Sequence, residues 1–217
     1  MDCTSILCAP EEDGLLFITL NRPEWMNSFT PTMSDELVDA YRRASADPAI
    51  RVIILAGAGK NFCAGMDLSA DGNVFGLDDS LTPTMEDLLN RPEDPALVKG
   101  VWDTGGRVVM AMVDCGKPII AAIHGAAVGV GATMPLAADI RMAADDARIG
   151  FAFGRDPESC SSWFLPRLVG PQQAFEWFYS AEPFPASEGL AAVCPRICRP
   201  GFPGTREACR PCPASMC

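Results

Sequence analysis

The sequence predicts an α/β fold, and three observations carry that prediction. Short apolar runs typical of buried strands recur along the chain. Between them lie longer stretches whose apolar residues repeat at helical spacing. Glycine-containing turns follow two of the runs, as expected where a strand leads into a helix. Strands and helices that alternate in this way pack as layers of one α/β domain.

The first predicted strand is the apolar run 14–20 (GLLFITL), which Asn21-Arg22-Pro23 ends. A helix is expected to begin at Thr30 and Pro31, because a threonine N-cap followed by proline in the first helical position is a common helix start. Met33, Leu37, Val38 and Tyr41 keep one face of this helix apolar, and Asp47-Pro48 closes it.

The remaining elements follow from the same patterns. Residues 52–56 (VIILA), 118–123 (PIIAAI) and 138–144 (ADIRMAA) are predicted strands, and about 103–115 is a second amphipathic helix. Residues 72–100 are rich in Asp, Asn, Pro and Gly and predict a long surface excursion.

Composition limits the class of protein. The chain has 217 residues, 48% of them hydrophobic, and a net charge of −11, which suits one globular domain. The acidic balance argues against nucleic acid as a main partner, since phosphate binding needs clustered Lys and Arg. No apolar run is long enough to span a membrane, and the N-terminus lacks a signal pattern. We therefore expect a soluble cytoplasmic protein.

The cysteines divide the chain into two parts. Of ten cysteines, five crowd the last 24 residues, together with four arginines and five prolines. We predict a core domain over 1–192 and a disordered Cys/Pro/Arg-rich tail over 193–217. Two interpretations of the tail remain: a zinc site, or a C-terminus read out of frame, which we favour. The candidate zinc ligands are Cys194, Cys198, Cys209 and Cys212, of which the last two have ligand spacing.

Two turns could carry chemistry: 62–68 (FCAGMDL) and 125–131 (GAAVGVG). Glycine allows backbone N–H groups to approach a ligand closely, and a following helix N-terminus adds unsatisfied donors. Two such N–H groups can form an oxyanion hole. The alternative is that the glycines only permit tight packing, and spacing alone leaves both open. The second turn matches neither a dinucleotide-binding nor a P-loop motif.

Four segments in order resemble the enoyl-CoA hydratase/isomerase (crotonase) family: GLLFITLNRPEWMNSFT, VIILAGAGKNFCAGMDLS, KPIIAAIHGAAVGVGATM and SSWFLPRLVG. The resemblance implies a spiral of ββα units, an acyl-CoA thioester substrate, no further cofactor and a homotrimer or hexamer. It also implies a role in fatty acid metabolism. Relatives continue into C-terminal helices, which this chain largely lacks, so we expect a weakened trimer and an open acyl site.

By this resemblance, the oxyanion-hole donors are the N–H groups of Met66 and Val130. Residues that match the family's CoA-contacting positions are Trp25, Met26, Ala64, Gly65, Met66, Asp67 and Leu68. No residue is assigned to a metal.

The acid–base residues depart from the family's hydratases, which use two glutamates. This chain has Thr133 and Phe153 at those positions. Glu158 instead matches the single proton-shuttling carboxylate of the family's isomerases, and we expect burial against Trp163 and Phe164 to raise its pKa. The shortened loop before it makes Asp156 the nearest substitute.

We therefore expect enoyl-CoA double-bond isomerisation. The alternatives are enoyl-CoA hydration by family descent and an inactive member that binds acyl-CoA. Three further residues receive structural interpretations: Cys63 as a small core residue, His124 as a packing or hydrogen-bonded residue, and Pro135 as a kink in the helix after the second turn.

Overall fold

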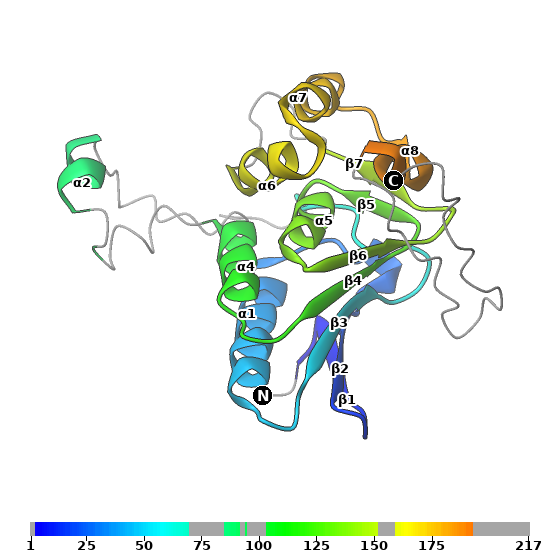
Figure 1. Ribbon diagram of the computed structural model, residues 1–217. Helices are drawn as coiled ribbons and strands as arrows, with labels where there is room; N and C mark the ends of the chain where they lie inside the picture. The colour runs from blue at the N-terminus through cyan, green and yellow to red at the C-terminus, as the bar shows by residue number, and fades with distance from the viewer. Residues whose placement is uncertain (1–2, 70–84, 92–93, 95–102, 152–158, 193–217) are drawn as a thin grey trace, which may run out of the picture.

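The computed structural model describes residues 3–69, 85–91, 94, 103–151 and 159–192. Its centre is a five-stranded sheet in the order β1-β2-β3-β4-β6, and a three-stranded sheet in the order β5-β7-β8 lies beside it (Figure 1). Neighbouring strands of the larger sheet are parallel except β1 and β2, which are antiparallel. The strands are β1 (Ile6–Pro10), β2 (Leu15–Leu20), β3 (Val52–Gly57), β4 (Ile119–Ile123), β5 (Ala126–Val128), β6 (Ile140–Ala143), β7 (Arg148–Gly150) and β8 (Phe184–Pro185).

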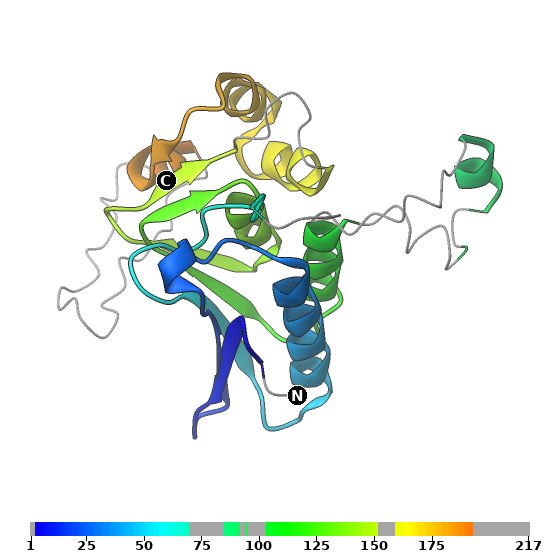
Figure 2. The same cartoon turned by 180° about the vertical axis from the view of Figure 1, so that it is seen from behind.

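Helices flank these sheets. Helices α1 and α4 lie side by side along one face of the larger sheet, whereas α6, α7 and α8 lie near the smaller one (Figures 1 and 2). The helices are η1 (Pro23–Trp25), α1 (Pro31–Ala46), α2 (Met85–Asn90), α4 (Thr104–Val113), α5 (Val130–Thr133), η2 (Met134–Ala137), α6 (Ser159–Val169), α7 (Pro171–Ser180) and α8 (Ala186–Ala192).

The α/β class and the main elements are confirmed. Helix α1 begins as predicted, with the Thr30 hydroxyl accepting from the Met33 backbone N–H at 3.1 Å. Its apolar residues Met33, Leu37, Val38 and Tyr41 are buried. The predicted excursion 72–100 falls mainly outside the described residues, which include helix α2 within it. The tail 193–217 lies outside them entirely.

The N-terminal segment is fastened to α1 by one carboxylate. Glu36 accepts hydrogen bonds from the backbone N–H groups of Thr4, Ser5 and Ile6 at 2.7, 2.9 and 3.1 Å. The Thr4 hydroxyl donates to the same group. These bonds satisfy N–H groups where the chain enters the edge strand β1.

The prediction for Pro135 was wrong. Helix α5 ends at Thr133, and the chain continues as the 3₁₀ helix η2, in whose first turn Pro135 lies. Proline lacks a backbone N–H but costs little in a first turn, where that N–H has no partner in any case. A change of helix type therefore replaces the expected kink.

Two buried hydrophobic clusters fill the interior. The larger lies between the five-stranded sheet and α1 and α4. The smaller consists of Ala132, Phe151, Leu165, Ala174, Trp177 and Phe184. The Trp177 and Phe184 rings stack with centroids 4.0 Å apart, and Phe151 packs beside them. The smaller cluster thus joins β7 and β8 to α6 and α7.

Across the described ranges, no helix is both long and apolar enough to cross a membrane.

Candidate active site

The two glycine-containing turns predicted from the sequence pack directly against each other. Cys63 forms an isolated parallel bridge with Ala127. Its N–H donates to the Ala126 carbonyl at 3.0 Å, and its carbonyl accepts from the Val128 N–H at 2.9 Å. A Cβ atom at Gly131 would lie only 2.3 Å from the Cys63 carbonyl oxygen, so the absence of a side chain permits this approach. Chain segments more than sixty residues apart are thereby held at one point.

The first turn is also held on its other side. Phe29 bridges Met66 in parallel, with its N–H donating to the Gly65 carbonyl at 2.8 Å and its carbonyl accepting from the Asp67 N–H at 2.9 Å. Gly65 has φ of +107°, a conformation that glycine adopts readily. Both hydrogen bonds of this bridge are made by the residues on either side of Met66, namely Gly65 and Asp67. In a parallel bridge of this kind, the N–H group of the central residue, here Met66, points away from the partner strand.

The second turn leads into a short helix. Gly129, with φ of +57°, precedes α5, whose first residue is Val130. The first N–H groups of a helix have no partner within it. Helix α5 has four residues and is shorter than the helix expected after this turn, so the Val130 N–H group would act as a local donor. A Cβ at Gly65 would lie 3.3 Å from the Val128 carbonyl oxygen, which places the two turns in contact.

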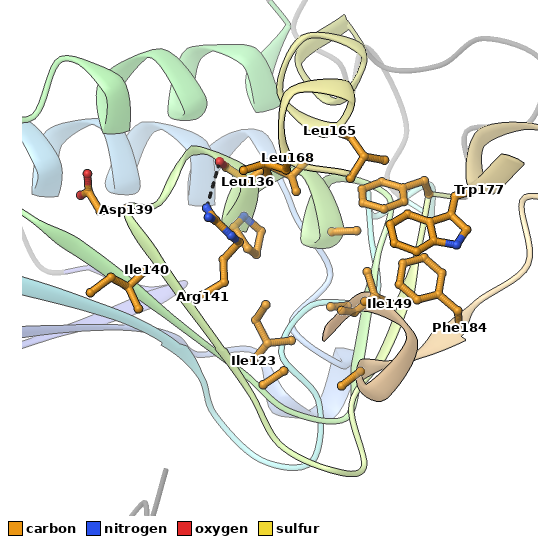
Figure 3. A pocket seen from close by; sticks show the side chains of 17 residues that line it. Ile123, Leu136, Asp139, Ile140, Arg141, Ile149, Leu165, Leu168, Trp177 and Phe184 are labelled. Atoms are coloured by element: carbon orange, nitrogen blue, oxygen red, sulfur yellow. Dashed lines mark hydrogen bonds between the residues drawn. The ribbon is translucent and has the colours of Figure 1, made fainter. Parts of the chain in front are cut away.

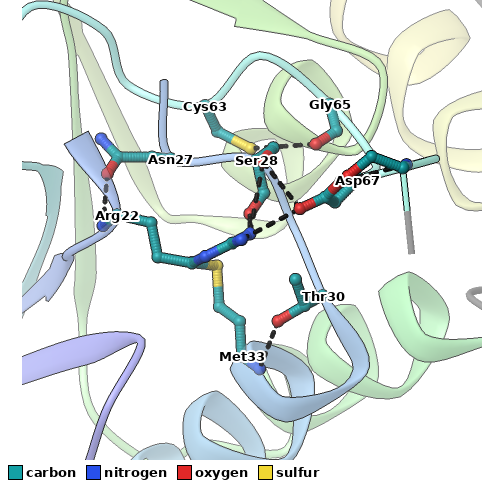
Figure 4. Close-up of polar contacts among 9 residues, drawn as sticks. Arg22, Asn27, Ser28, Thr30, Met33, Cys63, Gly65 and Asp67 are labelled. Atoms are coloured by element: carbon teal, nitrogen blue, oxygen red, sulfur yellow. Dashed lines mark hydrogen bonds and ion pairs between the residues drawn. The ribbon is translucent and has the colours of Figure 1, made fainter. Parts of the chain in front are cut away.

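An ion pair braces the first turn, as Figure 4 shows. Arg22 donates from Nη2 to Asp67 Oδ2 at 3.0 Å and from Nη1 to the Ser28 carbonyl at 2.6 Å. Both members are largely buried, with side-chain exposures of 19% and 10%. Hydrogen bonds from Ser69, together with the Arg22 guanidinium, lower the pKa of Asp67 to about 2. Asp67 is therefore a charged brace, although the sequence suggested it only as a CoA-contacting position.

Two asparagines that sequence reasoning did not single out fix the surrounding loops. Asn27 is fully buried; its amide donates to the Ala58 and Asn61 carbonyls at 2.8 and 2.7 Å, and its Oδ1 accepts from the Arg22 N–H. The Asn61 amide oxygen accepts from the Ala126 N–H at 3.0 Å. Asn27 has φ of +54°, which asparagine tolerates better than most residues. The only feature of the sequence that could have indicated this role is that Asn27 follows shortly after the break at Asn21-Arg22-Pro23.

The residues expected to contact CoA divide into two groups. Trp25, Met26 and Leu68 are 55%, 53% and 71% exposed, which is unusual for large apolar side chains. The Ala64 N–H donates to the Met26 carbonyl at 3.0 Å, so the two segments meet. Gly65 is buried and shapes the turn. An exposed apolar edge thus borders the paired turns, where a ligand could cover it.

The acid–base candidates are described only in part. Thr133 is fully buried, and its hydroxyl donates to the Gly129 carbonyl at 3.3 Å, so it offers no carboxylate and no free hydroxyl. Phe153, Asp156 and Glu158 lie outside the described residues. The burial of Glu158 against Trp163 therefore stays a prediction; the Trp163 ring itself is 59% exposed, and the Arg167 guanidinium stacks 3.4 Å from its centroid.

Two other interpretations are confirmed. Cys63 is fully buried in the main cluster, and burial raises the pKa of its thiol to about 12. It is therefore a core residue and no nucleophile. The His124 ring Nε2 lies 3.2 Å from the Gly59 carbonyl, as expected of a hydrogen-bonded residue. No group of three potential ligands lies together in the described ranges, and the four candidate zinc cysteines fall outside them.

The fold and the paired turns define an α/β protein in which the loops after two neighbouring parallel strands, β3 and β4, meet. Comparison with known proteins agrees: the family described as "Enoyl-CoA hydratase/isomerase" matches residues 10–193. The chain belongs to this family, and the fold is that of the crotonase structures.

Some similar proteins are named hydratases and others isomerases. The chain is 35% identical over 184 residues to the enoyl-CoA hydratase ACTT3 of Alternaria alternata, covering 83% of this chain and 56% of the relative. It is 37% identical over 166 residues to the 1,2-epoxyphenylacetyl-CoA isomerase of Escherichia coli K12, covering 75% and 58%. The solved structure of enoyl-CoA hydratase EchA8_6 from Mycobacterium marinum matches with a TM-score of 0.70 and 31% identity, covering 91% of this chain and 85% of that one. The chain thus spans little more than half the length of these two curated relatives.

Proposed function

We propose that the chain binds an acyl-CoA thioester and catalyses enoyl-CoA double-bond isomerisation. The N–H groups of Met66 and Val130 would hold the thioester oxygen, and Glu158 would move a proton between C2 and C4. One carboxylate suffices for this reaction, because the group that removes the proton returns it while the oxyanion hole stabilises the dienolate. The carrying observation is the contact between the two turns, which brings together the distant segments that contain Met66 and Val130.

The acyl-CoA itself is supported by family membership and by the exposed edge beside the turns. Trp25, Met26 and Leu68 offer exposed apolar surface on the first turn and on the segment hydrogen-bonded to it. Aromatic and aliphatic surface of this kind suits an adenine ring or a pantetheine chain. CoA would enter as part of the substrate, so the reaction needs no separate cofactor.

Isomerisation is favoured over hydration because of what occupies the position after the second turn. Hydration needs a base for water and an acid for the α-carbon, and buried Thr133 supplies neither.

The start of α6 supports a role for Glu158. A Cβ at Gly106 would lie 3.8 Å from Cys160 Sγ, and one at the adjacent Gly105 would lie 3.0 Å from Val130 Cγ2. The start of α6, which directly follows Glu158 in the sequence, therefore lies near the part of α4 that contacts Val130.

Steady-state kinetics of 3-enoyl-CoA isomerisation and 2-enoyl-CoA hydration test this proposal. We expect isomerisation in the wild type and a loss of about 10²–10⁴-fold in kcat for Glu158→Gln. Glu176→Gln, at an exposed position of α7, serves as the matched control and should be unchanged. Isomerisation that survives Glu158→Gln but is lost in Asp156→Asn would transfer the role to Asp156.

The same assays separate the alternatives. Hydration without isomerisation would make the chain a hydratase, and acyl-CoA binding without either reaction would make it an inactive binding member. Assembly as a homotrimer or hexamer belongs to the same proposal, and sedimentation equilibrium would measure it directly.

A further inference from the structure

A second feature of the molecule is an apolar cavity of about 480 Å³, which Ala127 of the second turn helps to line. It lies between the two hydrophobic clusters: Ile123 and Ala143 belong to the larger, and Phe151, Trp177 and Phe184 to the smaller. Neither Met66 nor Val130 lines it. Protein interiors are close-packed, and a space of this size is in the range of small-molecule sites.

The cavity has two chemically different ends, as Figure 3 shows. At one end the stacked Trp177 and Phe184 rings face the space, with Ile149 beside them. At the other end lies Arg141, on the edge strand β6. The long axis between these ends is bordered by aliphatic side chains, including Ile123 and Leu165. This arrangement suits an elongated ligand that is apolar along its length and polar at one end.

Arg141 points to the charge of that polar end. Its Nη1 donates to the Ala138 and Leu136 carbonyls at 2.6 and 3.4 Å. Within the described part of the chain, no carboxylate forms an ion pair with it. Burial lowers the pKa of Arg141, because its guanidinium charge is partly removed from water. A desolvated guanidinium without an anion is costly, and a carboxylate is its natural bidentate partner.

Asp139 does not fill this role. It lies exposed at the cavity rim, where its Oδ2 accepts from the Ile119 N–H at 2.8 Å. Its charge raises the pKa of Arg141 in opposition to burial, but the two side chains form no ion pair in the described structure. Ile140 beside it is 51% exposed, so the rim is accessible to solvent in the described structure.

We propose that this cavity binds a medium-chain fatty carboxylate, with the carboxylate on the Arg141 guanidinium and the hydrocarbon chain extending to the Trp177 and Phe184 rings. The ligand would fill the space between the two clusters and supply an anion to Arg141, which pairs with no carboxylate among the described residues. The site differs from the proposed oxyanion hole, since neither Met66 nor Val130 lines it, although Ala127 of the second turn does.

Isothermal titration calorimetry with decanoate below its micellar concentration tests the proposal, with decanol as the uncharged probe. We expect saturable binding of both, with a negative heat-capacity change from apolar burial, and tighter binding of decanoate. Arg141→Gln should weaken decanoate at least tenfold and leave decanol unchanged. Arg148→Gln, an exposed arginine on neighbouring β7 outside the cavity, is the matched control and should bind both as the wild type does.

A second variant keeps the test valid if Arg141→Gln fails to fold. A Cβ at Gly189 would meet Phe184 at 3.4 Å and Ile149 at 3.8 Å, which is ordinary contact, so Gly189→Leu should fill the cavity without a backbone clash. It should abolish binding of both probes. Three results would overturn the proposal. They are no binding of decanoate to the wild type, binding to Gly189→Leu as tight as to the wild type, and an Arg141→Gln variant that weakens decanoate and decanol equally. A wild-type dimer that Gly189→Leu dissociates would overturn it too, since a second copy would then occupy the cavity.

Discussion

Replacing Gly131 by alanine should separate the two turns on which the candidate site depends. The added Cβ would lie 2.3 Å from the Cys63 carbonyl oxygen and 2.8 Å from the Cys63 Cβ. Both are far inside contact distance, and one is a backbone atom that cannot rotate away. The same carbonyl accepts from the Val128 N–H at 2.9 Å, so any shift that relieves the clash also breaks this hydrogen bond.

The expected cost combines these two effects. Overpacking a dense site costs about 1–3 kcal/mol, and a lost buried hydrogen bond adds about 0.5–1.5 kcal/mol. We therefore expect Gly131→Ala to lower the free energy of unfolding by about 2–4 kcal/mol. For a chain of this length, that corresponds to a fall in Tm of roughly 4–16 °C.

Urea unfolding followed by circular dichroism measures this change. Gly116→Ala is the matched control, because its Cβ would meet only Ser45 Oγ at 3.7 Å. It should alter the free energy of unfolding by no more than about 0.5 kcal/mol. If Gly131→Ala were as stable as Gly116→Ala, the close approach of the two turns would be refuted.

Three further predictions concern named polar groups. Glu36→Ala should lower the free energy of unfolding by about 1–3 kcal/mol, since three backbone donors lose their acceptor; an unchanged urea midpoint would contradict this. Tyr41→Phe should be neutral or stabilising by up to ~1 kcal/mol, because the buried Tyr41 hydroxyl has no hydrogen-bond partner in the described structure; calorimetric melting checks it, and a clear loss of stability would argue for a hidden partner. The pKa of Asp67 is lowered in the folded state to about 2 from 3.8, so its contribution to stability is present above about pH 4 and is lost as pH falls toward 2; urea midpoints across pH 2–7 should show an acid-side loss that Asp67→Asn removes.

The elements that could be predicted from the sequence are those fixed by local patterns. Helix α1 was located by the Thr30 cap and Pro31, and β3 and β4 by their apolar runs. The same local reasoning failed at Pro135. A switch from an α-helix to a 3₁₀ helix leaves no mark in the spacing of apolar residues, so the sequence does not show where α5 ends.

The site was predictable only where glycine marked it. The close approach at Gly131 leaves a signal in the sequence, since no other residue fits there. The ion pair between Arg22 and Asp67 spans 45 positions and leaves no signal in the sequence, because the sequence does not distinguish a buried arginine from an exposed one. The exposure of Trp163, and the cavity beside Arg141, depend on how separate helices and strands pack, which periodicity does not encode.

The central claim, that the paired turns polarise a thioester through backbone donors, is tested most directly by infrared spectroscopy of bound substrate. A 2-enoyl-CoA labelled with ¹³C at the thioester carbonyl would be measured free and bound, with unlabelled ligand subtracted. Hydrogen bonds to the carbonyl oxygen from two N–H groups should lower its stretching frequency on binding, whether or not turnover follows. A bound thioester whose carbonyl frequency equals that of the free ligand would contradict the account.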